Sequence, residues 1–347
     1  MIRQSRVSLK FTNKSKIEKF DYLTQEMLRV INIFVNELWK QQNFSSKFID
    51  FKVDTFLSAR MQQCLGKQAL ENVKSQRKKK NKTMPIIKNI SFNIDNRFFD
   101  LKQGNYFDMF LRFKSLGNKT FFNIPIKLHK HYNNLIQKGF KLKNSIRLLK
   151  IKNQYYIDFI FKKKEEELTS IGNVVGFDCG YKKLLVSSNG DYIGQDFENI
   201  YKNISNKKQG SNAFKRSLKQ RDNKINEILN CLDLSNIKEV VVEDLKNVKH
   251  KSKLRKKFNN KLQRWSYPKV LVKLSRLCEE KGILFTKVNP RYTSQKCSCC
   301  GLIQKNNRKG EKYECSCGNV MDADLNAAIN ISLMGVYSPH TSRNIFI

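Results

Sequence analysis

The chain has 347 residues and carries 67 Lys and Arg against 30 Asp and Glu, a formal net charge of +37. The excess positive charges repel one another on a folded surface, and a polyanionic partner would relieve this repulsion. Nucleic acid is the first candidate for such a partner. The chain contains no run of about 18 apolar residues, so no membrane-spanning helix and no membrane partner are expected. Hydrophobic residues make up 40% and Pro occupies only 5 positions, which argues against a disordered chain.

The chain is longer than one hydrophobic core usually supports, so two or more modules are expected. Five of the nine cysteines lie between Cys297 and Cys317, and the other four are scattered singly. This distribution favours a reduced cytoplasmic protein with one metal site over a disulfide framework. Binding to DNA would associate such a protein with the nucleoid.

The first half of the chain begins with a predicted strand and two predicted helices. Alternation indicates a strand over residues 2–11, and apolar residues spaced three and four apart predict an amphipathic helix over 17–39. A second helix is predicted over 56–73. The basic run that follows, residues 74–82, is typical either of a solvated loop or of a phosphate contact.

Residues 84–164 indicate short strands with Gly and Asn at the breaks, at 107–113, 121–126, 146–151 and 155–161. Basic and aromatic residues alternate here, as in Arg112-Phe113-Lys114. This pattern is typical of an ordinary half-buried sheet or of a sheet that lies along nucleic acid. Residues 162–167 are a predicted linker, and a new domain is expected to begin near Ile171.

The second domain is predicted to mix strands and helices. A strand ending at Asp178 opens it, and a hairpin turns at Asn189-Gly190-Asp191. The elements that follow are a basic helix over 214–231, a strand over 239–243, a helix over 265–281 and a strand over 283–288. This succession indicates an α/β layer, in which ligands bind at the strand ends.

Three carboxylates are the candidate catalytic residues. Asp178 and Glu243 each end an apolar β-branched run, which places both at strand ends where side chains can converge. Asp324 lies in the segment Asp-Ala-Asp-Leu-Asn-Ala-Ala at the start of a predicted helix, where Asp322 is either the cap or a further acid. Asp244 is expected to point to the opposite face of its strand from Glu243.

Carboxylates in this arrangement suit hard divalent cations. Mg²⁺, or Mn²⁺ in its place, prefers a few carboxylates together with water and substrate phosphate oxygens. Three acids that hold two such ions can activate a water and stabilise a leaving oxygen, which is the chemistry of phosphodiester cleavage. The sequence therefore predicts a two-metal site made by Asp178, Glu243 and Asp324.

A cluster of cysteines precedes the last helix. Cys297 and Cys300 have the two-residue spacing of a zinc knuckle, and Cys315 and Cys317 supply a second, tighter pair. Four thiolates would close a tetrahedral structural Zn²⁺ site, and metal binding would supply the folding energy that the polar loop between the pairs lacks. Cys299 could replace one ligand, and a redox or merely buried cluster is the alternative.

Together these motifs resemble TnpB, the RuvC-like nuclease of bacterial transposons, which is related to the compact effectors of type V CRISPR systems. The resemblance is specific over residues 171–334 and loose before them. The matching segments are Gly176-Phe177-Asp178, Val242-Glu243-Asp244-Leu245, residues 292–301 and residues 322–330.

The resemblance implies an α/β RNase H-like (RuvC) nuclease domain with a zinc-ribbon insertion, and an N-terminal wedge-like β-barrel interrupted by a helical recognition module. Asp178, Glu243 and Asp324 would be the nuclease triad. The implied domains are the wedge at 1–15 and 84–167, the recognition module at 16–83, the nuclease domain at 171–296 and 318–335, the zinc-binding insertion at 297–317, and a C-terminal tail at 336–347.

By the same resemblance the chain would be an endonuclease that a guide RNA directs to double-stranded target DNA beside a short adjacent motif. Base pairing would then read the sequence and leave the protein to hold phosphate backbones. The alternatives are a guided DNA-binding repressor, a guide-free nuclease or resolvase, and an RNA-packaging protein. The basic residues expected to contact phosphates are Arg77, Lys78, Lys79, Lys80, Lys251, Lys253, Arg255, Lys256 and Lys257.

Overall fold

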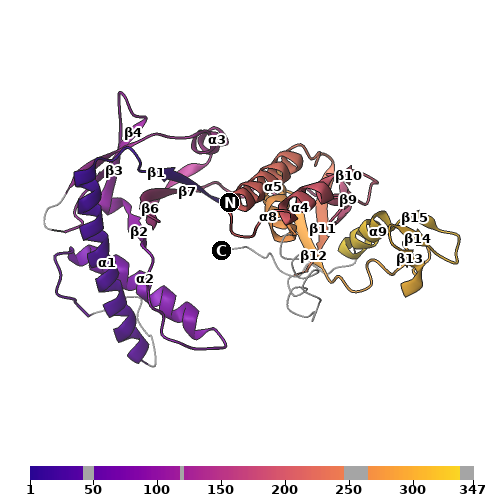
Figure 1. Ribbon diagram of the computed structural model, residues 1–347, viewed down its shortest axis with the longest axis horizontal. Helices are drawn as coiled ribbons and strands as arrows, with labels where there is room; N and C mark the ends of the chain where they lie inside the picture. Colours follow the sequence, from indigo (N-terminus) through magenta and orange to yellow (C-terminus); the bar gives the residue numbers. More distant parts are fainter. Residues whose placement is uncertain (42–50, 118–120, 246–264, 337–347) are drawn as a thin grey trace. The chain divides into compact units, whose positions relative to one another are not determined.

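The computed structural model describes all residues of the chain except 42–50, 118–120, 246–264 and 337–347. The chain divides into two compact units, Met1–Lys164 and Glu165–Ile347, and each is described by itself (Figure 1). None of the helices in the described ranges combines the length and apolar character needed to cross a bilayer. The predicted phosphate contacts Lys251, Lys253, Arg255, Lys256 and Lys257, and nearly all of the predicted tail, lie outside the described residues.

Two long helices that pack against each other form the first part of unit 1, α1 (Lys14–Lys40) and α2 (Ala59–Arg77). Each begins at a polar cap, because Asn13 and Ser58 accept hydrogen bonds from the backbone N–H three residues further on. The apolar row of α1, from Phe20 to Leu38, is buried. Both predicted helices are confirmed, with ends that differ from the prediction by about one turn.

Unit 1 also contains two antiparallel sheets, with strand orders β1-β7-β6-β2 and β3-β4-β5. The recorded pairing between described strands does not close into a ring, so the wedge-like barrel stays a prediction. The elements are β1 (Ile2–Ser8), β2 (Ser91–Asp95), the 3₁₀ turn η1 (Asn96–Phe98), β3 (Phe99–Gln103), β4 (Met109–Phe113), β5 (Phe122–Ile126), α3 (Lys130–Gln137), β6 (Lys141–Ile151) and β7 (Gln154–Lys162).

Unit 2 is built on one mixed sheet with the strand order β10-β9-β8-β11-β12. Strands β8, β11 and β12 are parallel, and the β9–β10 hairpin continues the sheet beyond β8 in antiparallel fashion. Strand β8 ends at Asp178 as predicted, β9 and β10 flank the predicted turn at residues 189–191, and β11 and β12 agree with the predicted strands to within two residues. Their bounds are β8 (Asn173–Asp178), β9 (Leu185–Ser187), β10 (Tyr192–Ile193), β11 (Ile237–Glu243) and β12 (Leu284–Val288).

Helices cover both faces of this sheet, because β8 and β11 carry apolar side chains on both sides. One face packs against α4 (Phe197–Ser205), α5 (Asn212–Asn230) and α8 (Tyr267–Lys281), through a core that includes Phe177 and Val240. On the other face Val241 packs against Ile331 of α9 (Ala323–Val336). Figure 1 shows α4, α5 and α8 on one side of the strands and α9 on the other.

Between β12 and α9 the chain forms a small sheet of three short strands with order β13-β14-β15. We call residues 293–322, which include this sheet and the cysteine cluster, the ribbon. The last strand runs directly into α9. The elements are η2 (Lys305–Asn307), β13 (Arg308–Lys309), β14 (Lys312–Glu314) and β15 (Val320–Asp322).

Gly176 allows α9 to lie directly on β8. A Cβ at this position would lie 2.3 Å from the carbonyl oxygen of Ala328 and 2.4 Å from the amide nitrogen of Ser332. Both are backbone atoms of α9, so a side chain could be accommodated only if the helix moved. The absence of a side chain at Gly176 therefore fixes the distance between α9 and the sheet.

We expect Gly176→Ala to destabilise unit 2 by about 3 kcal/mol, at the upper end for an overpacked site, because backbone atoms rather than flexible side chains oppose the added carbon. Gly190→Ala is the control. Its turn has φ +92° but no atom within 4 Å, so it should cost only about 1–2 kcal/mol of backbone strain. Urea unfolding followed by Trp265 fluorescence, in a Trp39→Phe background, measures both, and equal losses would contradict the close-approach explanation.

Candidate carboxylate site and thiolate cluster

Strand register and alternation place Asp178 and Glu243 beside each other on one face of the sheet. Val241 pairs with Gly176 and Val242 pairs with Phe177, so the two acids follow at neighbouring strand ends. Side chains two residues apart share a face. Asp178 therefore lies on the side of Gly176, and Glu243 on the side of Val241, which is the face covered by α9.

Asp324 lies in the first turn of α9 and completes this group. Asp322 Oδ1 accepts hydrogen bonds from the backbone N–H of Asp324 at 2.9 Å and of Leu325 at 3.1 Å. Asp322 is therefore the helix cap, one of its two predicted roles. The structure brings the three predicted acids close enough for the charge of Asp324 to act on Asp178.

The proton affinity of the two strand-end acids, Asp178 and Glu243, is raised by their surroundings. Burial, followed by the negative charges of Glu243 and Asp324, raises the pKa of Asp178 to about 8, and the positive charge of Arg308 opposes this rise. Burial also raises the pKa of Glu243, against a hydrogen bond from Thr293 and the charge of Arg308. Both shifts have the direction expected for carboxyl groups removed from water.

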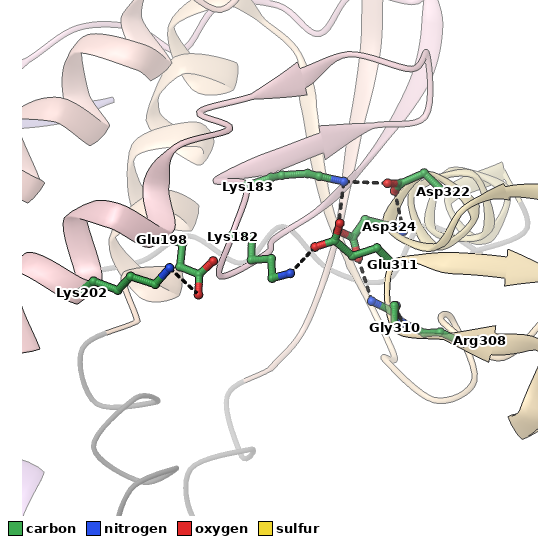
Figure 2. A network of polar contacts seen from close by, with 9 residues as sticks. All are labelled: Lys182, Lys183, Glu198, Lys202, Arg308, Gly310, Glu311, Asp322 and Asp324. Carbon is green, nitrogen blue, oxygen red and sulfur yellow. Dashed lines mark hydrogen bonds and ion pairs between the residues drawn. The ribbon is translucent and has the colours of Figure 1, made fainter.

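Two basic side chains that the sequence analysis missed lie against Asp324 and its cap (Figure 2). Arg308 Nη2 donates to Asp324 Oδ1 at 2.8 Å. Lys183 Nζ lies 2.7 Å from Asp322 Oδ2 and 3.6 Å from Asp324 Oδ2. Burial would raise the pKa of Asp322, but hydrogen bonds from Lys183 and from the backbone hold it below its usual value.

The ribbon also contacts the loop that follows β8. Figure 2 shows Lys182 pointing to Glu311 of the ribbon, with which it forms an ion pair. Both side chains are more than half exposed, so this pair adds little stability by itself. The pair matters because it shows that two consecutive residues, Lys182 and Lys183, contact the ribbon next to the start of α9.

The donor set fits hard divalent cations. Three carboxylates from two strand ends and one helix offer oxygen ligands, and a dication would reverse the upward pKa shifts of Asp178 and Glu243. The carboxylate oxygens lie farther from one another than the four thiolate sulfur atoms do. Within the described residues, the one group of three or more candidate ligand atoms that all lie within 4.8 Å of one another is formed by cysteines.

That group is Cys297, Cys300, Cys315 and Cys317, the four cysteines predicted from the sequence. Cys297 Sγ lies 3.7 Å from Cys317 Sγ, and Cys300 Sγ lies 3.6 Å from Cys315 Sγ. A tetrahedral ion with bonds of about 2.3 Å to sulfur requires sulfur atoms roughly 3.8 Å apart, so the cluster fits Zn²⁺. Cys299 is exposed and lies outside the group.

Local hydrogen bonds favour the thiolate form of one cysteine of the cluster, Cys297. Burial opposes ionisation of Cys297, but N–H groups of Cys300 and Cys299 and the side chain of Asn319 lower its pKa to about 6. The tight second pair is accommodated by a turn in which Gly318 N–H donates to Cys315 O at 3.0 Å and Gly318 has φ +88°. Thiolates are the ligand form that metals bind.

The predicted phosphate contacts in unit 1 divide into two kinds. Arg77 donates to the backbone carbonyl oxygens of Leu38, Trp39 and Gln41, and its guanidinium lies over the Trp39 ring. These bonds satisfy carbonyl groups at the C-terminal end of α1, so Arg77 has a structural role. Residues 78–80, in contrast, are exposed lysines just beyond α2.

Residues 267–331 match the family model described as Cas12f1-like, TNB domain. The CRISPR-associated endodeoxyribonuclease Cas12f1 of Sulfoacidibacillus thermotolerans is 38% identical over 99 residues, 28% of this chain and 22% of that relative. A TnpB-like protein of Aquifex aeolicus (strain VF5) is 27% identical over 59% of this chain and 82% of its own length. The chain is similar to both over these stretches. The match thus spans about a fifth of the Cas12f1 relative and most of the TnpB-like one.

A solved Cas12f1 structure has the same overall fold. It superimposes with a TM-score of 0.61 at 16% identity and covers 92% of this chain and 83% of the Cas12f1 chain. That structure is a complex with an sgRNA and target DNA. The predicted resemblance to TnpB and the compact type V effectors is therefore confirmed, and the structural match extends it to the fold.

The raised pKa of Asp178 predicts a pH dependence of stability. The folded state binds this proton more tightly than the unfolded chain, where the pKa is near 3.8. Its contribution is fully present below pH 4 and is lost as pH rises towards 8. Since one pKa unit corresponds to about 1.4 kcal/mol, Asp178→Asn should be more stable than the wild type by about 5 kcal/mol at pH 8 without magnesium.

Thermal unfolding at a series of pH values measures this difference, which should vanish near pH 4. Addition of Mg²⁺ at pH 8 should stabilise the wild type and leave Asp178→Asn unchanged. Asp196→Asn is the matched control, since Asp196 is exposed and makes no capping hydrogen bond. Parallel pH curves for wild type and Asp178→Asn would contradict the half-buried, like-charged site.

Proposed function

We propose that the protein is an RNA-guided endodeoxyribonuclease that cleaves double-stranded DNA beside a short adjacent motif by two-metal-ion phosphodiester hydrolysis. The observation that carries this proposal is the meeting of Asp178, Glu243 and Asp324 at the ends of β8 and β11 and in the first turn of α9. Neighbouring carboxyl groups with raised pKa values are typical of a functional site.

Asp178, Glu243 and Asp324 would hold Mg²⁺, or Mn²⁺ in its place. When bound, such ions supply activation of a water and stabilisation of the leaving oxygen. Arg308 and Lys183 hold Asp324 and Asp322 by ion pairs. Since a bound dication would weaken the hold of Asp324 on Arg308, its guanidinium would then be free to bind a phosphate oxygen of the substrate.

The proposed partners are a guide RNA and target double-stranded DNA. The net charge of +37 supports a polyanionic partner, and the structurally similar Cas12f1 is bound to RNA and DNA of these kinds. Exposed Lys78, Lys79 and Lys80 would contact phosphates in unit 1. The contacts predicted at residues 251–257 belong to the same proposal and fall outside the described residues.

Within this proposal, residues 171–296 and 318–335 of unit 2 are the RNase H-like (RuvC) nuclease domain, and residues 297–317 of the ribbon are its zinc-binding insertion. The mixed sheet with acids at the ends of β8 and β11 supports the first assignment. The sulfur distances support a structural Zn²⁺ held by Cys297, Cys300, Cys315 and Cys317. Unit 1 would supply the wedge and the helical recognition module.

The decisive variant is Asp178→Ala. Loss of one of three ligands should lower cleavage by at least about 1000-fold, because metal and water can no longer be positioned for attack. Binding of RNA and DNA should remain within about twofold. The assay uses protein purified with its RNA, which is sequenced, and a plasmid carrying the matching target beside a randomised flank. Asp196→Ala is the control for loss of an exposed Asp in the same unit.

The other functions give different results in this assay. Target binding by the wild type without cleavage in Mg²⁺ or Mn²⁺ would identify a guided repressor. Cleavage that persists after removal of RNA would identify a guide-free nuclease or resolvase. Undiminished cleavage by Asp178→Ala would refute the assignment of the acids.

The thiolate cluster predicts one zinc ion per chain. Cys300→Ser should reduce the zinc content to near zero and lower the melting temperature of unit 2, because metal binding is part of the folding energy of such a sheet. Cys299→Ser should keep the full zinc content, since Cys299 lies outside the group. Elemental analysis by mass spectrometry measures both, and a loss of zinc in Cys299→Ser alone would contradict the ligand assignment.

A further inference from the structure

The backbone on both sides of Glu243 is fixed by neighbouring elements. The Tyr267 hydroxyl of α8 donates to the carbonyl oxygen of Glu243 and accepts from Leu245 N–H at 3.0 Å. Asp244 N–H donates to Val288 O of β12 at 2.8 Å. These bonds fix where the side chain of Glu243 begins. They leave its three side-chain torsions free, so the position of the carboxylate needs a contact of its own.

Thr293 supplies that contact. Its hydroxyl donates a hydrogen bond to Glu243 Oε1. Thr293 is only 3% exposed, so water does not compete freely for the bond. The hydroxyl has one proton, and its other neighbour is Pro290 O at 3.1 Å. A charged carboxylate is the stronger acceptor of the two.

Thr293 is itself held by α9, the helix that carries Asp324. Asn330 Nδ2 donates to Thr293 O at 2.9 Å and to Lys296 O at 2.7 Å. Asn326 Nδ2 donates to Lys296 O at 2.8 Å. Both amide side chains are buried, at 3% and 0% exposed. The start of the ribbon therefore cannot shift along α9 without breaking buried hydrogen bonds, each of which is costly to leave unmade.

We propose that Thr293 is a positioning residue for the carboxylate site. Its hydroxyl fixes the carboxylate of Glu243 relative to Asp324, because Asn330 and Asn326 attach the segment 293–296 to the helix that carries Asp324. The proposal rests on the proposed function, since it assigns Thr293 to the same acids. Groups that orient a metal ligand typically change metal affinity or activity about 10- to 100-fold when they are removed.

The test compares Thr293→Val, which keeps the shape and removes the hydroxyl, with Thr293→Ser, which keeps the hydroxyl. Mn²⁺ binding to the full-length chain freed of RNA is measured by electron paramagnetic resonance. We expect Thr293→Val to bind Mn²⁺ about 10- to 100-fold more weakly and Thr293→Ser to stay within about threefold of the wild type. Thr293→Ala, which adds no atoms, is measured beside them and should follow Thr293→Val even if the valine variant folds poorly.

Thr24→Val is the matched control for loss of a buried threonine hydroxyl. Thr24 is fully buried in unit 1, where its hydroxyl donates to Phe20 O at 2.7 Å. It should lower the melting temperature without changing Mn²⁺ affinity. Wild-type affinity in Thr293→Val and Thr293→Ala would overturn the proposal, as would a loss in Thr293→Ser as large as in Thr293→Val.

A second readout separates this inference from the proposed function. Cleavage by the RNA-bound protein is measured over a range of Mg²⁺ concentrations, and Thr293→Val should need about 10-fold more Mg²⁺ for half-maximal rate. If the wild type binds Mn²⁺ but cuts no DNA, the proposed function fails while the Mn²⁺ series still decides the role of Thr293. If the wild type cuts DNA and Thr293→Val does so with an unchanged Mg²⁺ requirement, the proposed function stands and the inference fails.

Discussion

Mutual repulsion of three carboxylates is the constraint around which unit 2 is arranged. Asp178 and Glu243 sit at neighbouring strand ends, and α9 adds Asp324 on the same face. Burial raises the pKa of both strand-end acids, and the charges of Glu243 and Asp324 raise that of Asp178 further. Positive charge that offsets this repulsion comes from Arg308 and Lys183, and the N-terminal end of α9 adds its partial positive charge. Because each group belongs to a different segment, the site exists only when sheet, helix and ribbon are assembled together.

The sequence predicts the parts of this site that depend on local pattern. The apolar runs before Asp178 and Glu243 have the length and composition of buried strands, and the Asp-rich segment before α9 has the composition of a capped helix, so all three positions follow from periodicity and capping. The roles of Arg308, Lys183 and Thr293 do not follow from local pattern. Each of them contacts a residue far along the chain, at separations of 16, 139 and 50 positions respectively. No local pattern distinguishes such residues from ordinary surface or loop positions.

In unit 1, too, the sequence pattern does not predict every element or the role of every residue. The long apolar row of α1 identifies the helix, whereas β2 and β3 lie inside the range predicted to form short strands but are not located within it by the pattern. In the basic run after α2, Arg77 and the three lysines that follow look equivalent in sequence. Only the position of α1 shows that Arg77 binds backbone carbonyl groups while residues 78–80 remain exposed.

The ribbon is part of the carboxylate site rather than an appendage to it. It contacts the surroundings of the acids through Thr293 at Glu243, Arg308 at Asp324 and Glu311 at Lys182. Its own core is small, with Tyr313 buried among Cys297 and Cys315, so it has few apolar contacts to keep these three residues in place. A metal held by the four thiolates would therefore stabilise the positions of Thr293 and Arg308 as well as the ribbon. The two predicted metal sites would thus be mechanically connected, because the residues that contact the acids belong to the same segment as the thiolates.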